Sequence, residues 1–326
     1  MTRTGPIVAV CACTFRRPSG LAALLDGIQS QTFDGGPEPE LTIHIIDNDA
    51  DGSARPFVED RASNMPWPLI YGHEPRRGLV RARNACLDAV PEAAEWVAFI
   101  DDDEVPSPGW LSALLITAEA HDASIVAGPM QPAFEQPPPG WVIEGKFFEL
   151  GPYGEGKPAA LISTNNVLLA MGPVRRHGWR FDERFNLTGG EDEHFFTRAK
   201  RAGLKAVTSA DALVTETVPA RRVRLPWLLR RHFRMGTTLA MIDASLDGGS
   251  RTMALRFAKA LGRMTVGLAR LGHVVLGNRA GAVWGLCELA RGAGTLSACG
   301  GFRYLEYDAK NYSSGLGEGK AGGTTP

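Results

Sequence analysis

The segment WVAFIDDDEVPSPGW (96–110) ends an apolar run with four consecutive acids, Asp101, Asp102, Asp103 and Glu104. The apolar run predicts a buried strand, and four like charges at its tip repel one another unless something neutralises them. In an extended chain Asp101 and Asp103 point to one side and Asp102 to the other. Carboxylate oxygens are the ligands that Mg²⁺ and Mn²⁺ prefer. The segment therefore predicts a divalent-cation site held by Asp101 and Asp103; the alternative is a solvated acidic turn.

Short apolar runs and helical patterns alternate around this segment. Strands are expected at 7–14, 41–48, 68–74, 96–100 and 124–130, and helices at 18–31, 78–90 and 108–121. Such alternation predicts β-α units on a largely parallel sheet. Ligands of these sheets bind beyond the carboxyl ends of the strands, which is where the four acids are expected.

The second half of the chain is less regular. Residues 131–160 are rich in proline and glycine, which predicts an excursion loop that could form a lid or an acceptor surface. After this loop we expect a strand at 161–170, a helix within 189–203, a strand-like segment at 204–216 and a basic helix at 225–246. The small, polar residues 313–326 predict a disordered tail.

Composition excludes several classes of protein. The 326-residue chain has 35 lysines and arginines against 36 acids, so no overall field favours nucleic acid as a partner. Five cysteines, an odd number, are typical of a reduced compartment. The N-terminus lacks the pattern of a signal peptide, and no apolar run predicts a transmembrane helix.

Two enzyme classes place an Asp-x-Asp motif at a strand end. Phosphatases with a nucleophilic aspartate carry Asp-x-Asp-x-Val/Thr, which "DDDEV" (101–105) matches. That motif normally follows the first strand of the domain, whereas about a hundred residues of predicted α/β structure precede it here. The phosphatase class therefore leaves much of the chain unexplained.

The chain resembles the family 2 glycosyltransferases of the GT-A fold over about residues 7–240. It is most similar to bacterial exopolysaccharide enzymes such as the succinoglycan glucosyltransferases. The motifs that carry the resemblance occur in order: VCACTFRRP (10–18), IIDNDADGSA (45–54), GLVRARNACLD (78–88), FIDDDEVPSPGWL (99–111), STNNVLLA (163–170) and FDERFNLTGGEDEHFFTRAKRAG (181–203). Each is weak alone, but six in register are a strong indication.

This resemblance implies a Rossmann-like, mostly parallel sheet with helices on both faces. The catalytic domain would span residues 1–240, with a nucleotide-binding half at 1–130 and an acceptor half at 131–240. A helical extension would follow at 241–312, and the tail at 313–326.

The donor nucleotide is expected at the carboxyl edge of the sheet. Thr14 and Arg16 end the first strand, Asp47 ends the second, and Asp47 and Arg83 could satisfy the polar edge of a uracil. Asp47 could instead form a turn, and Arg81 could face the ligand in place of Arg83. The full set expected to bind the nucleotide sugar is Thr14, Arg16, Asp47, Arg83, Asn84, Asp101, Asp102, Asn166, Arg231 and Arg234. The last two arginines are candidates to hold the departing diphosphate.

The motif GGED (189–192) supplies a second pair of acids. Its glycines allow close backbone approach and place Glu191 and Asp192 at the start of a helix, where acids also act as caps. Inverting glycosyl transfer needs a carboxylate that takes the proton of the acceptor hydroxyl. The resemblance assigns this role to Asp192 and implies that Glu191 contacts sugar hydroxyls.

The sequence departs from related enzymes after the GGED helix. Many relatives have a His-Glu-Pro segment there, whose histidine can approach the metal, whereas this chain has VTETVP (214–219). Thr215 therefore stands where a histidine is expected, and the third protein ligand stays open, with Glu216 as a possible helper.

Residues 253–279 read as a basic amphipathic helix. Its apolar positions share one face: Phe257, Leu261, Met264, Leu268, Leu271 and Val275. Its basic residues lie on another arc: Arg256, Lys259, Arg263 and Arg270. Such a helix can lie in an anionic membrane interface or can cover the catalytic domain.

Together these patterns predict an Mn²⁺- or Mg²⁺-dependent inverting glycosyltransferase. The resemblance implies transfer of a hexose, with glucose from UDP-glucose expected, to a lipid-linked oligosaccharide in bacterial surface polysaccharide synthesis. The expected location is cytoplasmic, peripherally attached to the inner face of the inner membrane. The alternatives are the phosphatase and a non-catalytic glycan-binding protein on the same fold; intact Asp103 and Asp192 argue against the latter.

Overall fold

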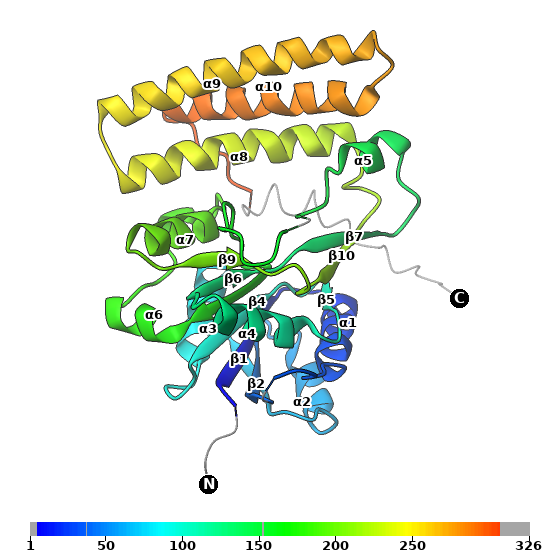
Figure 1. The fold of residues 1–326 in the computed structure, drawn as a ribbon, viewed down its shortest axis with the longest axis vertical. Coiled ribbons are helices and arrows are strands. Elements are labelled where there is room, and N and C mark those ends of the chain that lie inside the picture. The colour runs from blue at the N-terminus through cyan, green and yellow to red at the C-terminus, as the bar shows by residue number, and fades with distance from the viewer. Residues whose placement is uncertain (1–4, 37, 152, 307–326) are drawn as a thin grey trace.

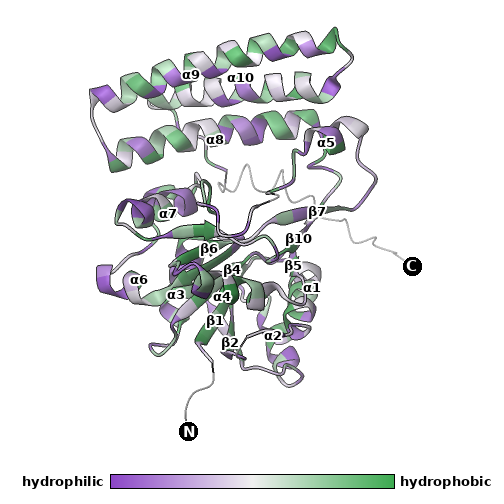
Figure 2. Ribbon diagram, viewed as in Figure 1, coloured by the Kyte–Doolittle hydropathy of each residue, from purple (hydrophilic) through white to green (hydrophobic). Residues whose placement is uncertain are grey.

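The computed structural model describes residues 5–36, 38–151 and 153–306 and has a central seven-stranded sheet (Figure 1). The order across the sheet is β3 (Leu69–His73), β2 (Glu40–Asp47), β1 (Ile7–Thr14), β4 (Trp96–Ile100), β8 (Asn166–Ala170), β6 (Ile125–Ala127) and β9 (Ala206–Thr208). Neighbouring strands are parallel except at β8, which runs antiparallel to β4 and β6. The predicted β-α alternation is confirmed, and its strands are visibly hydrophobic (Figure 2).

Helices cover both faces of this sheet because the buried strands carry apolar side chains on both sides. In β1, Ala9 and Cys11 face one core, whereas Val8, Val10 and Ala12 face the other. The first core is closed by α3 (Leu79–Ala89), α6 (Met171–His177) and α7 (Glu191–Arg201). The second is closed by α1 (Pro18–Gln29), α2 (Arg55–Ala62) and α4 (Trp110–Ala120). This is the predicted two-faced α/β architecture.

A second, three-stranded sheet stands beside the acids. Its order is β5 (Glu104–Pro106), β10 (Val214–Val218) and β7 (Met130–Phe134), with β10 antiparallel to β5 and parallel to β7. The expectation of an irregular loop at 131–160 was therefore incomplete, since this stretch contains most of β7 and also α5 (Gly140–Gly145). The strand was not predicted because its partner, β10, comes much later in the chain.

Three long helices form a layer over the part of the chain that holds the two sheets (Figure 1). They are α8 (Leu225–Leu246), α9 (Ser250–Leu271) and α10 (Arg279–Cys299), and the short helix η2 (Gly272–Val274) follows α9. The helix predicted at 253–279 thus ends early. Helices α9 and α10 pack closely at their glycines. A Cβ added to Gly267 would lie only 2.8 Å from the carbonyl oxygen of Gly285, so a larger residue would not fit there.

The predicted domain boundary at residue 240 lies inside α8, so the division of the chain at that point stays a prediction. The predicted tail, 313–326, lies outside the described residues. Among the helices that the structure describes, none is both long and apolar enough to cross a membrane.

Candidate functional site

The carboxyl ends of β1 and β4 bring Thr14 and the four acids together. The Thr14 hydroxyl donates to Oδ2 of Asp102 over 2.8 Å, and Nη1 of Arg17 donates to Oδ1 of Asp102 over 2.8 Å. Both oxygens of Asp102 are therefore occupied, and its side chain is only 6 % exposed. Burial raises the pKa of Asp102 to about 6, and Arg17 opposes this shift. Asp102 anchors the loop from within the protein.

Asp103 faces two arginines and a further acid. Its Oδ2 accepts a hydrogen bond of 2.9 Å from Nη1 of Arg17 and lies 3.7 Å from Nη2 of Arg222. Arg222 also donates to Oε1 of Glu216 over 2.7 Å. Burial and the charge of Asp103 raise the pKa of Glu216, while Arg222 and Arg231 lower it. Glu216 thus lies close to Asp103, on the strand where a histidine was expected.

Glu104, the fourth acid, has a structural position as the first residue of β5. It is fully buried, and its two oxygens accept hydrogen bonds from Nδ2 of Asn165 (2.7 Å) and from the backbone N–H of Asp101 (3.1 Å). Burial raises the pKa of Glu104 well above its usual range. Glu104 therefore shapes the turn that carries the other three acids.

Asp101 is the most accessible of the four acids, with 42 % of its side chain exposed. Its Oδ1 lies 3.7 Å from Nη2 of Arg83. Burial among the surrounding groups raises the pKa of Asp101; Arg83 opposes this shift, and the charges of Asp103 and Asp192 add to it. The charges of the GGED helix and of the strand tip therefore act on each other.

The GGED turn divides its two acids between different environments. Glu191 is buried and forms an ion pair with Arg83, and its other oxygen, Oε2, has no hydrogen-bond partner. Asp192 is partly exposed, and its Oδ2 accepts a hydrogen bond of 2.9 Å from the Ser163 hydroxyl. The ion pair shows that Glu191 holds Arg83, and the expected contact of Glu191 with sugar hydroxyls stays a prediction.

Helix α8 holds this turn in place. Gly190 has φ 88°, in the left-handed region, and a Cβ there would lie 1.9 Å from Cγ2 of Thr238 on α8. A glycine is therefore required at this position both by the backbone and by the packing of α8. The C-terminal helical layer thus helps to position Glu191 and Asp192.

Three residues predicted at the nucleotide have their polar groups engaged in the fold. Asp47 is fully buried, and its carboxylate accepts the backbone N–H groups of residues 49 and 54 over 2.9 and 2.8 Å. Asn84 exchanges two hydrogen bonds with the backbone of Phe181. Asn166 bonds to the Trp110 indole and to the carbonyls of residues 129 and 212. Each polar atom of these three side chains already has a partner in the protein, so Asp47, Asn84 and Asn166 support the fold, and their contact with the nucleotide stays a prediction.

The remaining predicted arginines are dispersed around the acids. Arg16 has φ 53° and forms a two-point ion pair with Asp49. Arg231 stacks on Trp227, with its guanidinium carbon 5.4 Å from the ring centre, and its charge acts on Glu216. Arg234 lies 3.8 Å from Glu306, so it faces the C-terminal segment. Arg231 is the better placed of the two to meet a ligand at the acids.

The carboxylates of Asp101 and Asp103 are the type of ligand that a divalent cation prefers, but they are only part of a ligand set. Carboxylates of Asp101 and Asp103 lie at one strand end, and Arg17, a cation, already bridges Asp102 and Asp103. Within residues 5–36, 38–151 and 153–306, no three histidine, cysteine or acidic side chains converge as a metal site. A cation held here would need ligands from water or from a substrate, as Mg²⁺ sites at phosphates commonly have.

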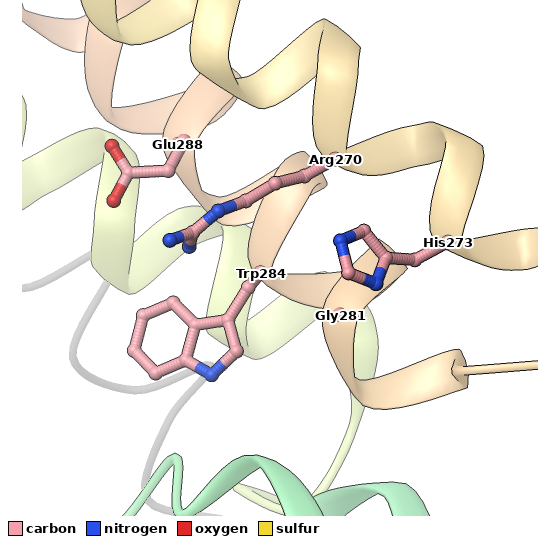
Figure 3. A pocket seen from close by; sticks show the side chains of 5 residues that line it. All are labelled: Arg270, His273, Gly281, Trp284 and Glu288. Atoms are coloured by element: carbon pink, nitrogen blue, oxygen red, sulfur yellow. The ribbon is translucent and has the colours of Figure 1, made fainter.

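A separate hollow lies in the helical layer. It has a volume of about 470 Å³ and is lined by Arg270, His273, Gly281, Trp284 and Glu288 (Figure 3). A neighbouring hollow of about 510 Å³ shares Gly281 and Trp284 and reaches α5. None of the acids at the strand tip lines either hollow.

Sequence reasoning missed Arg17, Arg222 and Ser163. The motif TFRRP contains two arginines, and only the first was selected. Arg222 was one of seven basic residues in the cluster at 220–236, with nothing to distinguish it. Ser163 precedes the strand β8 and meets Asp192 only in the folded chain.

Comparisons with known proteins agree with this geometry. Residues 9–177 match the sequence profile "Glycosyl transferase family 2". The chain is 35 % identical over 245 residues to the succinoglycan biosynthesis protein ExoM of Rhizobium meliloti, covering 75 % of this chain and 77 % of that protein. It is 21 % identical over 248 residues to the glucosyl-dolichyl phosphate glucuronosyltransferase of Haloferax volcanii, covering 72 % and 76 %.

Solved structures support the fold. The crystal structure of Staphylococcus aureus TarS 1-349 in complex with UDP superposes with a TM-score of 0.52 at 14 % identity, covering 91 % of this chain and 93 % of that one. This likeness identifies a GT-A fold. With the profile match over half of the chain and the identity to ExoM, it follows that the protein belongs to glycosyltransferase family 2.

Proposed function

We propose that the protein transfers a hexose, with glucose expected, from a UDP-sugar to a lipid-linked oligosaccharide, with inversion and with the aid of a divalent cation. The setting would be surface polysaccharide synthesis. The name of the similar ExoM protein refers to succinoglycan biosynthesis, and that of the Haloferax relative refers to glucosyl-dolichyl phosphate, a lipid-linked sugar. The observation that carries the proposal is the partly exposed carboxylate of Asp192 beside the acids at the tip of β4.

Asp192 is suited to act as the base. Its Oδ2 is oriented by Ser163, and its Oδ1 accepts the backbone N–H of Glu193 over 2.7 Å, which fixes the carboxylate at the start of α7. In the proposed step Asp192 takes the proton of an acceptor hydroxyl, whose oxygen forms a bond to the anomeric carbon. The bond from that carbon to the diphosphate breaks on the opposite side, so the configuration inverts.

The diphosphate leaves with negative charge that must be neutralised. A divalent cation bound to Asp101 and Asp103 would supply Lewis-acid stabilisation of this leaving group. Arg222 and Arg231 lie around the same acids and carry charge of the right sign for diphosphate oxygens. The cation and the arginines would thus stabilise the leaving diphosphate, while Asp192 would deprotonate the attacking hydroxyl.

A donor screen tests the proposal. Purified protein is mixed with a panel of nucleotide sugars, an extract of lipid-linked saccharides, and Mn²⁺ or Mg²⁺, and released nucleotide is measured. We expect Asp192→Asn to bind UDP-sugar like the wild type but to lose roughly a hundredfold or more in turnover. Glu193→Gln, the next residue of the same helix, is the matched control and should stay active. Retained turnover in Asp192→Asn would place the base elsewhere.

We propose further that the outer face of the helical layer binds the membrane that carries the acceptor. Arg256 and Arg263 form ion pairs with Asp243 and Glu288, so they belong to contacts between the helices rather than to a free basic face. The apolar side chains instead point outward. The exposed apolar residues of this layer are Leu255, Phe257, Leu261, Val266, Leu268, Val274, Val275 and Leu276, and Val275 is 89 % exposed.

An exposed apolar face of this kind is typical of a surface that binds a partner or lipid. The turn after α9 places Val274, Val275 and Leu276 next to Arg270 and His273, which line the hollow of about 470 Å³ (Figure 3) and are residue types that suit a headgroup region. We therefore expect the turn to enter the interface first.

Vesicle sedimentation tests the membrane proposal. Replacing Leu268, Val275 and Leu276 with serine should release the protein from anionic vesicles, because apolar burial in the interface is lost. A control double change at exposed apolar sites on other elements, Ile70 on β3 and Ile116 on α4 to serine, should leave binding unchanged. Equal sedimentation of the first variant and the wild type would contradict the proposal.

A further inference from the structure

We propose that Arg17 acts as an internal cation that holds Asp102 and Asp103 together in the free enzyme and competes with the divalent cation for Asp103. Arg17 is then a positioning residue that sets the affinity for the metal. This inference rests on the proposed function, because it assumes a cation site at Asp101 and Asp103.

The hydrogen bonds around Asp102 give it a fixed place. Its two oxygens are taken by Thr14 and Arg17, each over 2.8 Å, and its side chain is almost fully buried. A Cβ on Gly20, in the first turn of α1, would lie only 2.5 Å from the carbonyl oxygen of Asp102. The start of α1 and the acidic turn are therefore packed backbone to backbone.

Arg17 joins this fixed pair to the proposed metal ligand. The same Nη1 that binds Asp102 also donates to Oδ2 of Asp103 over 2.9 Å. Arg17 directly precedes α1, and Pro18 begins the helix, so the backbone of Arg17 is anchored next to the acids. Its side chain is 28 % exposed, which leaves the guanidinium a route to solvent.

A divalent cation bound to Asp103 would lie within a few ångströms of this guanidinium, and the two positive charges would repel each other. Without a metal, Arg17 neutralises carboxylates that would otherwise repel one another. When the cation binds, its two charges replace the single charge of Arg17 at Asp103. Arg17 therefore weakens metal binding to the free enzyme, because the cation must either bind beside this positive charge or open its ion pair with Asp103. Arg222, 3.7 Å from the same oxygen, makes a looser contact and acts in the same direction.

The neighbouring arginine provides a matched control. Arg16 has the same charge and adjoins Arg17 in the sequence, but its guanidinium contacts Asp49 and Asp51 at the end of the second strand. A general effect of net charge on metal binding would appear in both variants, whereas a specific effect would appear only at Arg17.

The test measures binding of Mn²⁺ alone, without nucleotide, from the electron paramagnetic resonance signal of the free ion. Arg17→Gln should bind Mn²⁺ roughly tenfold more tightly than the wild type, since a competing charge at hydrogen-bond distance is gone. Arg16→Gln should match the wild type. Arg17→Lys should lie between Arg17→Gln and the wild type, because an ammonium is a point charge without the planar fork.

Thermal unfolding provides a second readout. Arg17→Gln should melt lower than the wild type without metal and gain more from added Mn²⁺. The inference is wrong if Arg17→Gln binds Mn²⁺ as the wild type does or more weakly. If Arg17→Gln does not fold, Mn²⁺ binding by Arg17→Lys that is unchanged or weaker than that of the wild type contradicts the inference instead. If neither the wild type nor any variant binds Mn²⁺, even with UDP present, then both this inference and the metal role in the proposed function are wrong. Equal Mn²⁺ binding by all variants would refute only the role of Arg17.

Discussion

Removing one partner of the Arg83–Glu191 pair should destabilise the protein strongly. Both side chains are almost completely buried, and the second oxygen of Glu191 has no hydrogen-bond partner. Replacing Arg83 with methionine keeps an unbranched, flexible side chain but leaves a buried carboxylate without its counter-charge. Breaking a buried ion pair in this way costs about 3–5 kcal/mol, a large share of a typical stability of about 5–15 kcal/mol.

Urea unfolding followed by tryptophan fluorescence measures this effect. With an m value of about 3 kcal/mol/M, the midpoint of Arg83→Met should fall by roughly 1–2 M. The double variant Arg83→Met/Glu191→Leu should recover most of the loss, because apolar residues of similar volume often replace a buried pair without cost. Arg81→Met, on the same helix, is the control: its contact with the exposed Glu183 is 3.7 Å long, and such pairs contribute about 0–1 kcal/mol.

Two results would refute this reasoning. One is a midpoint for Arg83→Met as close to the wild type as that of Arg81→Met, which would mean that the pair is solvated. The other is a double variant whose loss equals the sum of the two single losses, since independent contributions would show that Arg83 and Glu191 do not act as a pair.

Two other predictions concern the metal and pH. Asp103→Asn should abolish Mn²⁺-dependent UDP binding, measured by calorimetry, because it removes the carboxylate that faces the cation; unchanged affinity would contradict the metal assignment. Burial lowers the pKa of His44 to about 4 from its ordinary 6.5, as it does for His194 and His232. Below pH 6.5 the unfolded chain therefore binds more protons than the folded chain, so the folded protein loses stability as the pH is lowered. The difference in unfolding free energy between the wild type and His44→Gln should therefore shrink by up to about 2 kcal/mol from pH 7 to pH 5; a constant difference would show that His44 is not buried neutral.

The local pattern of the sequence determined the fold of the catalytic core. Apolar runs such as 7–14 predict strands because side chains alternate between the faces of a sheet, and this signal needs no distant partner. The acids at 101–104 lie at a strand end for the same reason. β7 was not predicted, because its strand character depends on pairing with β10.

Only the tertiary structure decided which polar groups stay available to a ligand. Asp47, Asn84 and Asn166 have suitable side chains at suitable places in the sequence. Asp47 accepts the backbone N–H groups of the turn that follows its own strand, whereas backbone groups from distant segments bond to Asn84 and Asn166. Arg17 and Arg222 became important because they meet Asp103 in the folded chain. A sequence shows which residues can form a hydrogen bond or ion pair, whereas the choice among partners depends on distances that only packing fixes.

The same distinction holds for the C-terminal helices. The sequence determined that residues 253–271 are amphipathic. It did not determine which face turns inward, because glycines on α9 and α10 let the two helices approach through their small residues. Arg256 and Arg263 then find acids on α8 and α10, and the large apolar side chains are left on the outside. The helices pack through their glycines, so the large apolar side chains of α9 do not face the core of the layer. This arrangement depends on how close the backbones come, which the sequence pattern of α9 alone does not show.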